Sequence, residues 1–144
     1  MKTDADIQKK QILVGVMVRI PTGEIILMRK CSRENSRFRL IQEAQIEGEL
    51  PEATIIRGVL QKIGIRLSLA DVKHLFSVHS KKDADYHIYG CIVENLSRMH
   101  RAPVVIEEDL YEINMAPEGS VFDFSLNSEH RTMLRATISQ IRSK

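Results

Sequence analysis

Hydrophobic positions in the first quarter of the chain follow the pattern of β-strands. Residues 11–20 are rich in β-branched side chains, and residues 25–28 form a second apolar run after the segment 21–24. Proline and glycine within that intervening segment favour a reversal of the chain. The pattern therefore predicts a β-hairpin, followed by a polar loop over residues 31–37.

The spacing of apolar residues changes to a helical period after Pro51. Those that recur at intervals of three and four are Ala53, Ile56, Val59, Leu60 and Ile63. Proline suits the first position of a helix, and Gly64 suits the residue just past its end. We predict a helix over residues 51–63 with these five side chains on its buried face.

The second half of the chain predicts a further hairpin, two short strands and a closing helix. The hairpin strands are expected at 72–78 and 86–93, and the short strands at 104–106 and 110–115. Residues 128–143 carry apolar side chains at helical spacing and are expected to form the closing amphipathic helix. This order of elements is that of an α+β domain.

Composition narrows the class of protein only slightly. A length of 144 residues predicts one domain over residues 1–144, with residues 1–10 expected to be flexible. The beginning of the chain lacks the apolar core of a secretory signal, and no apolar run reaches the length of a bilayer, so we expect a cytoplasmic protein. A net charge of +2 gives no support for a nucleic-acid partner.

Residues 49–65 resemble the second half of a Nudix box, the pattern G-x5-E-x7-R-E-U-x-E-E-x-G-U in which U is a bulky aliphatic residue. Setting Arg57 on the arginine of the pattern places Glu49 on its first glutamate and Gly64 on its closing glycine. The two aliphatic positions are Val59 and Ile65. The resemblance implies the Nudix fold, an α/β/α sandwich with a mixed β-sheet.

The chain departs from that pattern at the positions that carry its chemistry. The three glutamates after the arginine, which hold Mg²⁺ or Mn²⁺ in active members, are here Gly58, Gln61 and Lys62, and the opening glycine is Glu43. A lysine ammonium repels a divalent cation and offers it no lone pair. The resemblance thus predicts a protein that has lost pyrophosphohydrolase activity and needs no metal cofactor.

A binding role is the first expectation for such a protein. The ligand would be a nucleotide or another phosphorylated small molecule, or else a protein partner, including a second copy of the chain. The candidate ligand-binding residues are Glu49, Arg57, Gly58, Gln61 and Lys62. We also predict a structural ion pair between Glu49 and Arg57. A glycine inside a helix indicates either close packing at Gly58 or drift after catalysis was lost, and drift is slightly favoured.

Two other functions stay open from the sequence. An atypical hydrolase would bind Mg²⁺ or Mn²⁺ through Glu47, Glu49 and Glu52, with Glu107 or Glu108 as its catalytic base. A self-associating structural protein would need no ligand. The histidines of the second predicted hairpin are expected to be ordinary strand or loop residues, because a zinc site needs three or four converging ligands.

Overall fold

The structure is a computed structural model that describes residues 10–20, 22–31, 37–79, 84–94, 99, 103–106 and 108–142. Its strands are β1 (Lys10–Arg19), β2 (Ile25–Lys30), β3 (Ile41–Ala44), β4 (Val72–His79), β5 (Ala84–Val93), β6 (Val104–Ile106) and β7 (Asp109–Ala116). Its helices are α1 (Pro51–Ile63) and α2 (Ser128–Arg142), with two 3-10 helices, η2 (Leu69–Asp71) and η3 (Glu118–Asp123). None of the helices described is long and apolar enough to cross a membrane.

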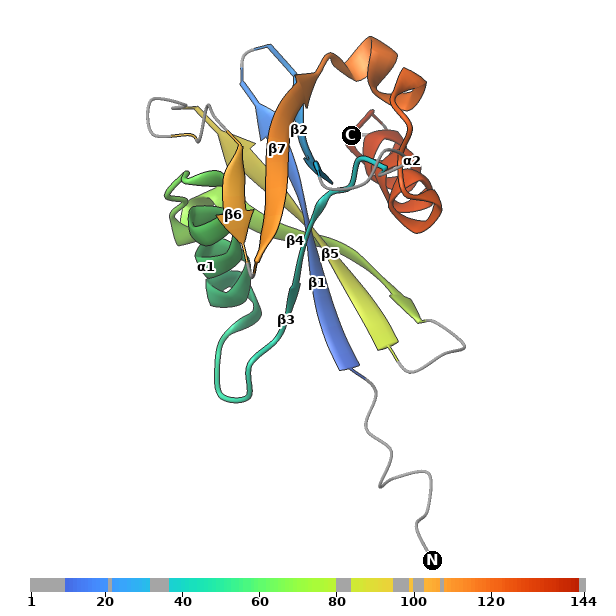
Figure 1. The fold of residues 1–144 in the computed structure, drawn as a ribbon. Helices are drawn as coiled ribbons and strands as arrows, with labels where there is room; N and C mark the ends of the chain where they lie inside the picture. Colours follow the sequence, from blue (N-terminus) through green and yellow to red (C-terminus); the bar gives the residue numbers. More distant parts are fainter. Residues whose placement is uncertain are drawn as a thin grey trace, which may run out of the picture.

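One mixed sheet of seven strands organises the fold (Figure 1). Its strand order is β4-β5-β1-β2-β7-β6, and β3 pairs with β1 outside this path. β1 runs parallel to β5 along its whole length, from Lys10 opposite Ala84 to Arg19 opposite Val93. On its other edge, β1 pairs antiparallel first with β3 and then with β2. The first half of the chain is therefore joined to the second through the central strand.

Both faces of the sheet are buried, and the alternation along β1 shows how. Leu13 and Met17 point into the core on the side of α1, whereas Val14 and Val16 point into the core on the side of α2. A strand covered on both faces is expected to be almost continuously apolar, as β1 is. In Figure 1 α1 and α2 lie on opposite sides of the sheet, which confirms the predicted mixed sheet between helices.

The elements predicted from the pattern are present, with small differences in their ends. Helix α1 has the predicted bounds, and both hairpins and the closing helix form where expected. The expectation of a flexible segment at 1–10 lies outside the described residues, except that Lys10 begins β1. Strand β3 and the two 3-10 helices were not predicted, because each is too short to show a period in the sequence.

The predicted buried face of α1 is partly wrong. The residues buried on this helix are Thr54, Ile55, Gly58, Val59 and Ile63. Leu60, placed on the buried face from the sequence, is 41% exposed, and Ile55 is fully buried in its place. Gly58 is buried as well, where its missing side chain lets Glu43 of β3 approach the helix closely.

Candidate functional site

Helix α1 begins and ends at residues whose backbone suits those positions. Pro51 lies in the first turn, where its missing N–H leaves no hydrogen bond unmade. Gly64 follows the last turn with φ of 87°, a left-handed conformation that glycine adopts without strain. Its N–H donates to the carbonyls of Leu60 and Val59 and closes the helix. The polar residues of α1 are thereby fixed relative to the loop before it and to β3.

Glu49 and Arg57 join the loop before α1 to the helix, which confirms the predicted pair. Arg57 Nε donates to Glu49 Oε2 and Arg57 Nη2 donates to Glu49 Oε1, both at 3.1 Å. Thr54 Oγ1 donates to Glu49 Oε1 at 2.6 Å. These bonds hold the pKa of Glu49 below its usual value, with Arg57 the larger cause, and they raise the pKa of Arg57. Such two-pronged geometry is the strong form of an arginine–carboxylate bond.

A second ion cluster fills the side of α1 that faces β3. A Cβ atom added at Gly58 would lie 2.3 Å from Glu43 Cγ, so the Glu43 side chain occupies the space that any other residue at 58 would need. Lys62 Nζ lies 2.7 Å from Glu43 Oε1, and Arg57 Nη1 lies 3.6 Å from Glu43 Oε2. The structure thus supports close packing at Gly58, the interpretation less favoured from the sequence.

Lys62 also makes a hydrogen bond to the backbone of β3. Its Nζ donates to the carbonyl oxygen of Gln42 at 2.7 Å. Glu43 Oε1 is buried and has no hydrogen-bond partner of good geometry, so its contact with Lys62 is an ion pair rather than a hydrogen bond. A carboxylate that is only 13% exposed is stabilised when two cations flank it. The cluster of Glu43, Arg57 and Lys62 therefore holds α1 against β3 by charge.

The other predicted site residues lie apart from this cluster. Gln61 and Glu47 are exposed, and Glu52 is half-buried. Burial raises the pKa of Tyr89, and the charge of Glu52 adds to the increase. Glu108 is exposed with φ of 73° in the turn between β6 and β7. Glu107 lies outside the described residues. A binding or catalytic role for any of these residues stays a prediction.

The histidines of β4 and β5 belong to a chain of hydrogen bonds across the sheet. His74 Nε2 lies 3.0 Å from Ser77 Oγ, which lies 2.8 Å from His87 Nδ1. His87 Nε2 in turn lies 2.6 Å from Gln11 Oε1. His79 lies outside this chain of bonds and faces Asp85, with its Nδ1 3.0 Å from Asp85 Oδ1. In the part of the chain that the structure describes, no three His, Cys, Asp or Glu side chains are placed to hold a metal ion.

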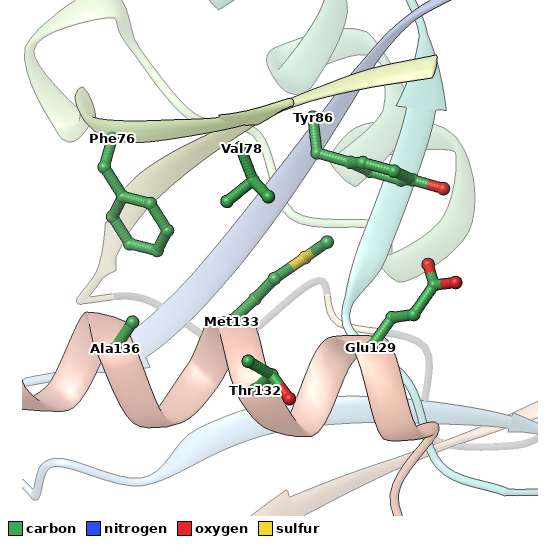
Figure 2. A pocket seen from close by; sticks show the side chains of 7 residues that line it. All are labelled: Phe76, Val78, Tyr86, Glu129, Thr132, Met133 and Ala136. Atoms are coloured by element: carbon green, nitrogen blue, oxygen red, sulfur yellow. The ribbon is translucent and has the colours of Figure 1, made fainter. Parts of the chain in front are cut away.

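On the other face of the sheet, a pocket of about 320 Å³ lies between α2 and the hairpin of β4 and β5 (Figure 2). It is lined by Phe76, Val78, Tyr86, Glu129, Thr132, Met133 and Ala136. Burial raises the pKa of Tyr86, and the negative charge of Glu129 adds to the increase. This pocket was not predicted from the sequence. Its only sign there is the helical spacing of Glu129, Met133 and Ala136 along α2.

His130 ties α2 to the segment before β3. The Leu40 N–H donates to His130 Nδ1 at 3.0 Å, and His130 Nε2 lies 2.8 Å from Gln42 Oε1. Burial, with a smaller contribution from Arg39, lowers the pKa of His130 to about 4. A neutral ring that accepts at Nδ1 must carry its proton at Nε2, so it donates there to Gln42.

Comparison with solved structures identifies the arrangement. MutT, in a study of the proteins from Aliivibrio salmonicida and Vibrio cholerae, matches with a TM-score of 0.73 at 10% identity, over 92% of this chain and 99% of MutT. The NUDIX domain of Shewanella oneidensis NrtR, solved in complex with ADP ribose, matches with a TM-score of 0.72 at 14% identity, over 99% of this chain and 92% of that domain. The chain has the Nudix fold. No family sequence profile and no curated protein matches it, so the likeness to Nudix structures defines the fold.

The Nudix fold raises the question of whether the residues of α1 can bind a divalent cation. In the sequence register described above, the metal would face positions 58, 61 and 62. Mg²⁺ and Mn²⁺ take oxygen ligands, and several of them must converge. Here Gly58 has no side chain and Lys62 carries a positive charge. The carboxylate of Glu43, which packs against Gly58, is already flanked by Lys62 and Arg57. This donor set does not fit a divalent cation.

Proposed function

We propose that this protein is a Nudix-fold binding protein that has lost metal-dependent pyrophosphohydrolase activity. The observation that carries the proposal is the cluster of Glu43, Gly58 and Lys62. In the Nudix box pattern, the position of Glu43 is a glycine and the position of Gly58 is a glutamate. This chain has the two residue types exchanged, and it has a lysine in place of a further metal-binding glutamate.

The exchange gives a physical reason for the loss of activity. A carboxylate at position 43 enters the space beside the helix, and only glycine at 58 leaves room for it. Lys62 then lies next to that carboxylate and supplies the positive charge that a metal ion would otherwise supply. A cation bound at this place would have to displace Lys62 from Glu43 and would gain few ligands in return.

The ligand we propose is a nucleotide or a related phosphorylated small molecule. Its support is the likeness of fold to the NrtR domain, which was solved with ADP ribose. Lys62 is the candidate for a phosphate contact, because its ammonium group is held at the surface of α1 with its side chain 20% exposed. A phosphate would share this lysine with Glu43.

Assays of hydrolysis test the first part of the proposal. Purified protein is incubated with ADP ribose, nucleoside diphosphate sugars, dinucleoside polyphosphates or nucleoside triphosphates, with Mg²⁺, with Mn²⁺ and with chelator. We expect product release to be the same with and without metal. Metal-dependent turnover that is abolished by Glu108→Gln, or by Glu52→Gln, would instead establish the atypical hydrolase.

A gain-of-function variant makes the same test sharper. Gly58→Glu, Gln61→Glu and Lys62→Glu restore the glutamates of the pattern, but Glu43 would collide with the new side chain at 58. The variant that adds Glu43→Gly is therefore expected to bind Mn²⁺ in calorimetry, whereas the variant that keeps Glu43 should bind it more weakly. Equal binding by the two variants would show that Glu43 does not block the site.

Calorimetric titration with ADP ribose in the absence of metal tests the ligand. Glu43→Gln frees Lys62 and should raise the affinity, whereas Lys62→Met should lower it. Glu94→Gln, at an exposed residue after β5, serves as the matched control and should leave the affinity unchanged. Identical affinities for all four proteins would remove Lys62 from the ligand site, without bearing on the loss of hydrolysis.

A further inference from the structure

A connected row of polar side chains lies on the α1 side of the sheet, opposite the pocket. Its members are Gln11, His74, Ser77, Asp85 and His87. Successive residues of a strand point to opposite faces. Gln11 and His87 therefore share a face with Leu13 and Tyr89, which belong to the core on the α1 side. In Figure 1 the hairpin end of β4 and β5 extends past α1, and the side chain of Ser77 is exposed there.

A β-bulge in β4 brings His74 and Ser77 onto this same face. Two residues three positions apart in a regular strand point to opposite faces. Here the pairing with β5 shifts after His74, which lies opposite Tyr89, so that Ser77 lies opposite His87. Bulges re-aim side chains in this way and are over-represented beside active sites. The bulge is thus the feature that assembles the row.

The carboxylate of Asp85 sets the direction of the hydrogen bonds along the row. A carboxylate accepts, so Gln11 presents its amide Nε2 to Asp85 Oδ2, at 3.5 Å, and its Oε1 to His87 Nε2, at 2.6 Å. The neutral ring of His87 therefore carries its proton on Nε2 and accepts at Nδ1. The hydroxyl of Ser77 donates to that Nδ1 at 2.8 Å, and Ser77 Oγ accepts from His74 Nε2 at 3.0 Å.

The state of His87 suits a general base. Burial, with a smaller effect from the charge of His74, lowers the pKa of His87, so its ring is neutral at neutral pH. A hydroxyl bonded to a neutral imidazole, whose other nitrogen is held by a third group, is the arrangement of an activated nucleophile. An amide oxygen serves as that third group in the Cys-His-Asn form of the triad. Gln11 has the same role here toward His87.

We propose that Ser77 is a nucleophile that takes acyl groups from small activated carboxylic esters, with His87 as its general base and Gln11 as a positioning residue. Ser77 Oγ bonds to the carbonyl carbon while its proton passes to His87 Nδ1. The tetrahedral intermediate then expels the alcohol, which takes that proton. One water molecule repeats both steps on the acyl-serine, releasing the carboxylic acid and restoring the hydroxyl. His74 supplies a single N–H beside the developing oxyanion, so we expect esters with good leaving groups rather than amides.

Hydrolysis of p-nitrophenyl acetate near neutral pH, without metal, tests the proposal. We expect turnover above a protein-free blank, and peptide mass spectrometry after acid quenching should find one acetyl group on Ser77. Ser77→Ala and His87→Gln should each lower the rate by about 100-fold, the low end of what a general base contributes. Ser125→Ala, at an exposed serine before α2, is the matched control and should leave the rate unchanged.

The pH dependence of the rate tests the positioning role of Gln11. The other titratable groups whose charges act on His87 are His74, His79 and Asp85. Because the pKa of His87 is lowered, the wild-type rate should hold its plateau to below pH 6.5. Gln11→Leu should lower the plateau, whereas Gln11→Glu keeps an acceptor, adds a negative charge and should move the midpoint of the profile to higher pH.

Three results would overturn the proposal. They are turnover no faster than the blank, an equal rate in Ser77→Ala, and acetyl groups found on histidine rather than on Ser77, since an exposed imidazole can itself attack an activated ester. Unfolding midpoints of the variants separate a loss of folding from a loss of chemistry. The row shares no residue with the ion cluster on α1, so these results leave the proposed binding function untouched.

Discussion

The two helices cover the two faces of the sheet by different means. α1 lies tightly against β3, because a glycine removes a side chain and charged groups of Glu43 and Lys62 meet in the space. α2 is joined to Leu40 and Gln42 by the buried His130 and to β4 by a hydrogen bond from Gln140 to the carbonyl of Leu75, and it leaves a pocket beside β4 and β5. The interface of α1 with the sheet is thus polar and closely packed, whereas that of α2 is apolar and contains a pocket.

The two faces differ in what they leave uncovered. On the α1 side, the chain's own carboxylates satisfy the cations that a ligand would use. On the α2 side, apolar walls remain partly uncovered, with Val78 39% exposed. Substitutions that remove a charge should therefore affect stability mainly at α1, and substitutions that change side-chain volume should affect it mainly at α2. His130 is the exception.

The largest expected effect comes from acid, through His130. Its pKa in the folded protein is about 4, below the ordinary value of 6.5, so the unfolded chain takes up this proton first as the pH falls. The contribution of the neutral ring to stability is complete above about pH 6.5 and is lost progressively between about pH 6.5 and 4, where the loss reaches about 3 kcal/mol. Urea unfolding at pH 7.5 and 4.5 measures it.

His130→Gln provides the control for this effect. Glutamine can still accept from the Leu40 N–H but does not titrate. Its free energy of unfolding should fall less between the two pH values than that of the wild type. The same fall in both proteins would assign the acid sensitivity to groups other than His130.

A smaller effect, with a change of sign, is expected at Gly58. Gly58→Ala forces the Glu43 side chain to move, and this overpacking should destabilise the protein by about 1–3 kcal/mol. The higher helix propensity of alanine should stabilise it by about 1 kcal/mol. The net result should be destabilisation by about 1 kcal/mol. With Glu43→Ala already present, the same substitution should stabilise the protein by about 1 kcal/mol. Chemical unfolding of the four proteins in this cycle measures both values.

A common sign in both backgrounds would contradict the close contact between Gly58 and Glu43. It would then be the helix, rather than the side chain of β3, that determines the residue at 58. Lys62→Met in the same assay gives a separate measure of the ion pair, because it leaves the space at 58 unchanged and removes the charge beside Glu43.

The smallest effect is expected for Arg57, which is partly exposed to solvent. Arg57→Ala removes both bonds to Glu49 and should lower the midpoint of thermal unfolding by about 2–4 °C. Arg57→Lys keeps the charge without the two-pronged geometry, so its midpoint should lie between those of the wild type and Arg57→Ala. Arg66→Ala, at an exposed arginine just after the helix, should leave the midpoint unchanged. An unchanged midpoint for Arg57→Ala would show the pair to be two independently solvated charges.

The elements could be predicted from the sequence because each has its own period or punctuation. Pro51 and Gly64 mark both ends of α1, and the apolar runs of β1, β4 and β5 are long enough to be distinct. The pair of Glu49 and Arg57 could also be predicted, since its spacing matches a known pattern. The buried face of α1 could not, because Ile55 and Ile56 are neighbours of the same type and only tertiary packing decides which of them is fully buried.

The partners of Glu43 and the pocket on α2 could not be predicted from the sequence for a related reason. Glu43 meets Gly58 and Lys62 in a fold in which β3 also pairs with β1, some 30 residues earlier in the chain. The pocket joins residues of β4 and β5 to a helix some 40 residues later. Such contacts are set by tertiary packing, and no local propensity encodes them.

The long parallel pairing of β1 with β5 has a consequence for the order of folding. The partners are 74 positions apart in the chain, from Lys10 opposite Ala84 to Arg19 opposite Val93. Closing so large a loop lowers the entropy of the chain before the contacts compensate for it, and non-local pairings of this kind slow folding. A nascent chain that ends before Val93 cannot complete its central strand. During synthesis the edge of β1 that pairs with β5 therefore has no partner strand until more than half of the chain has been made.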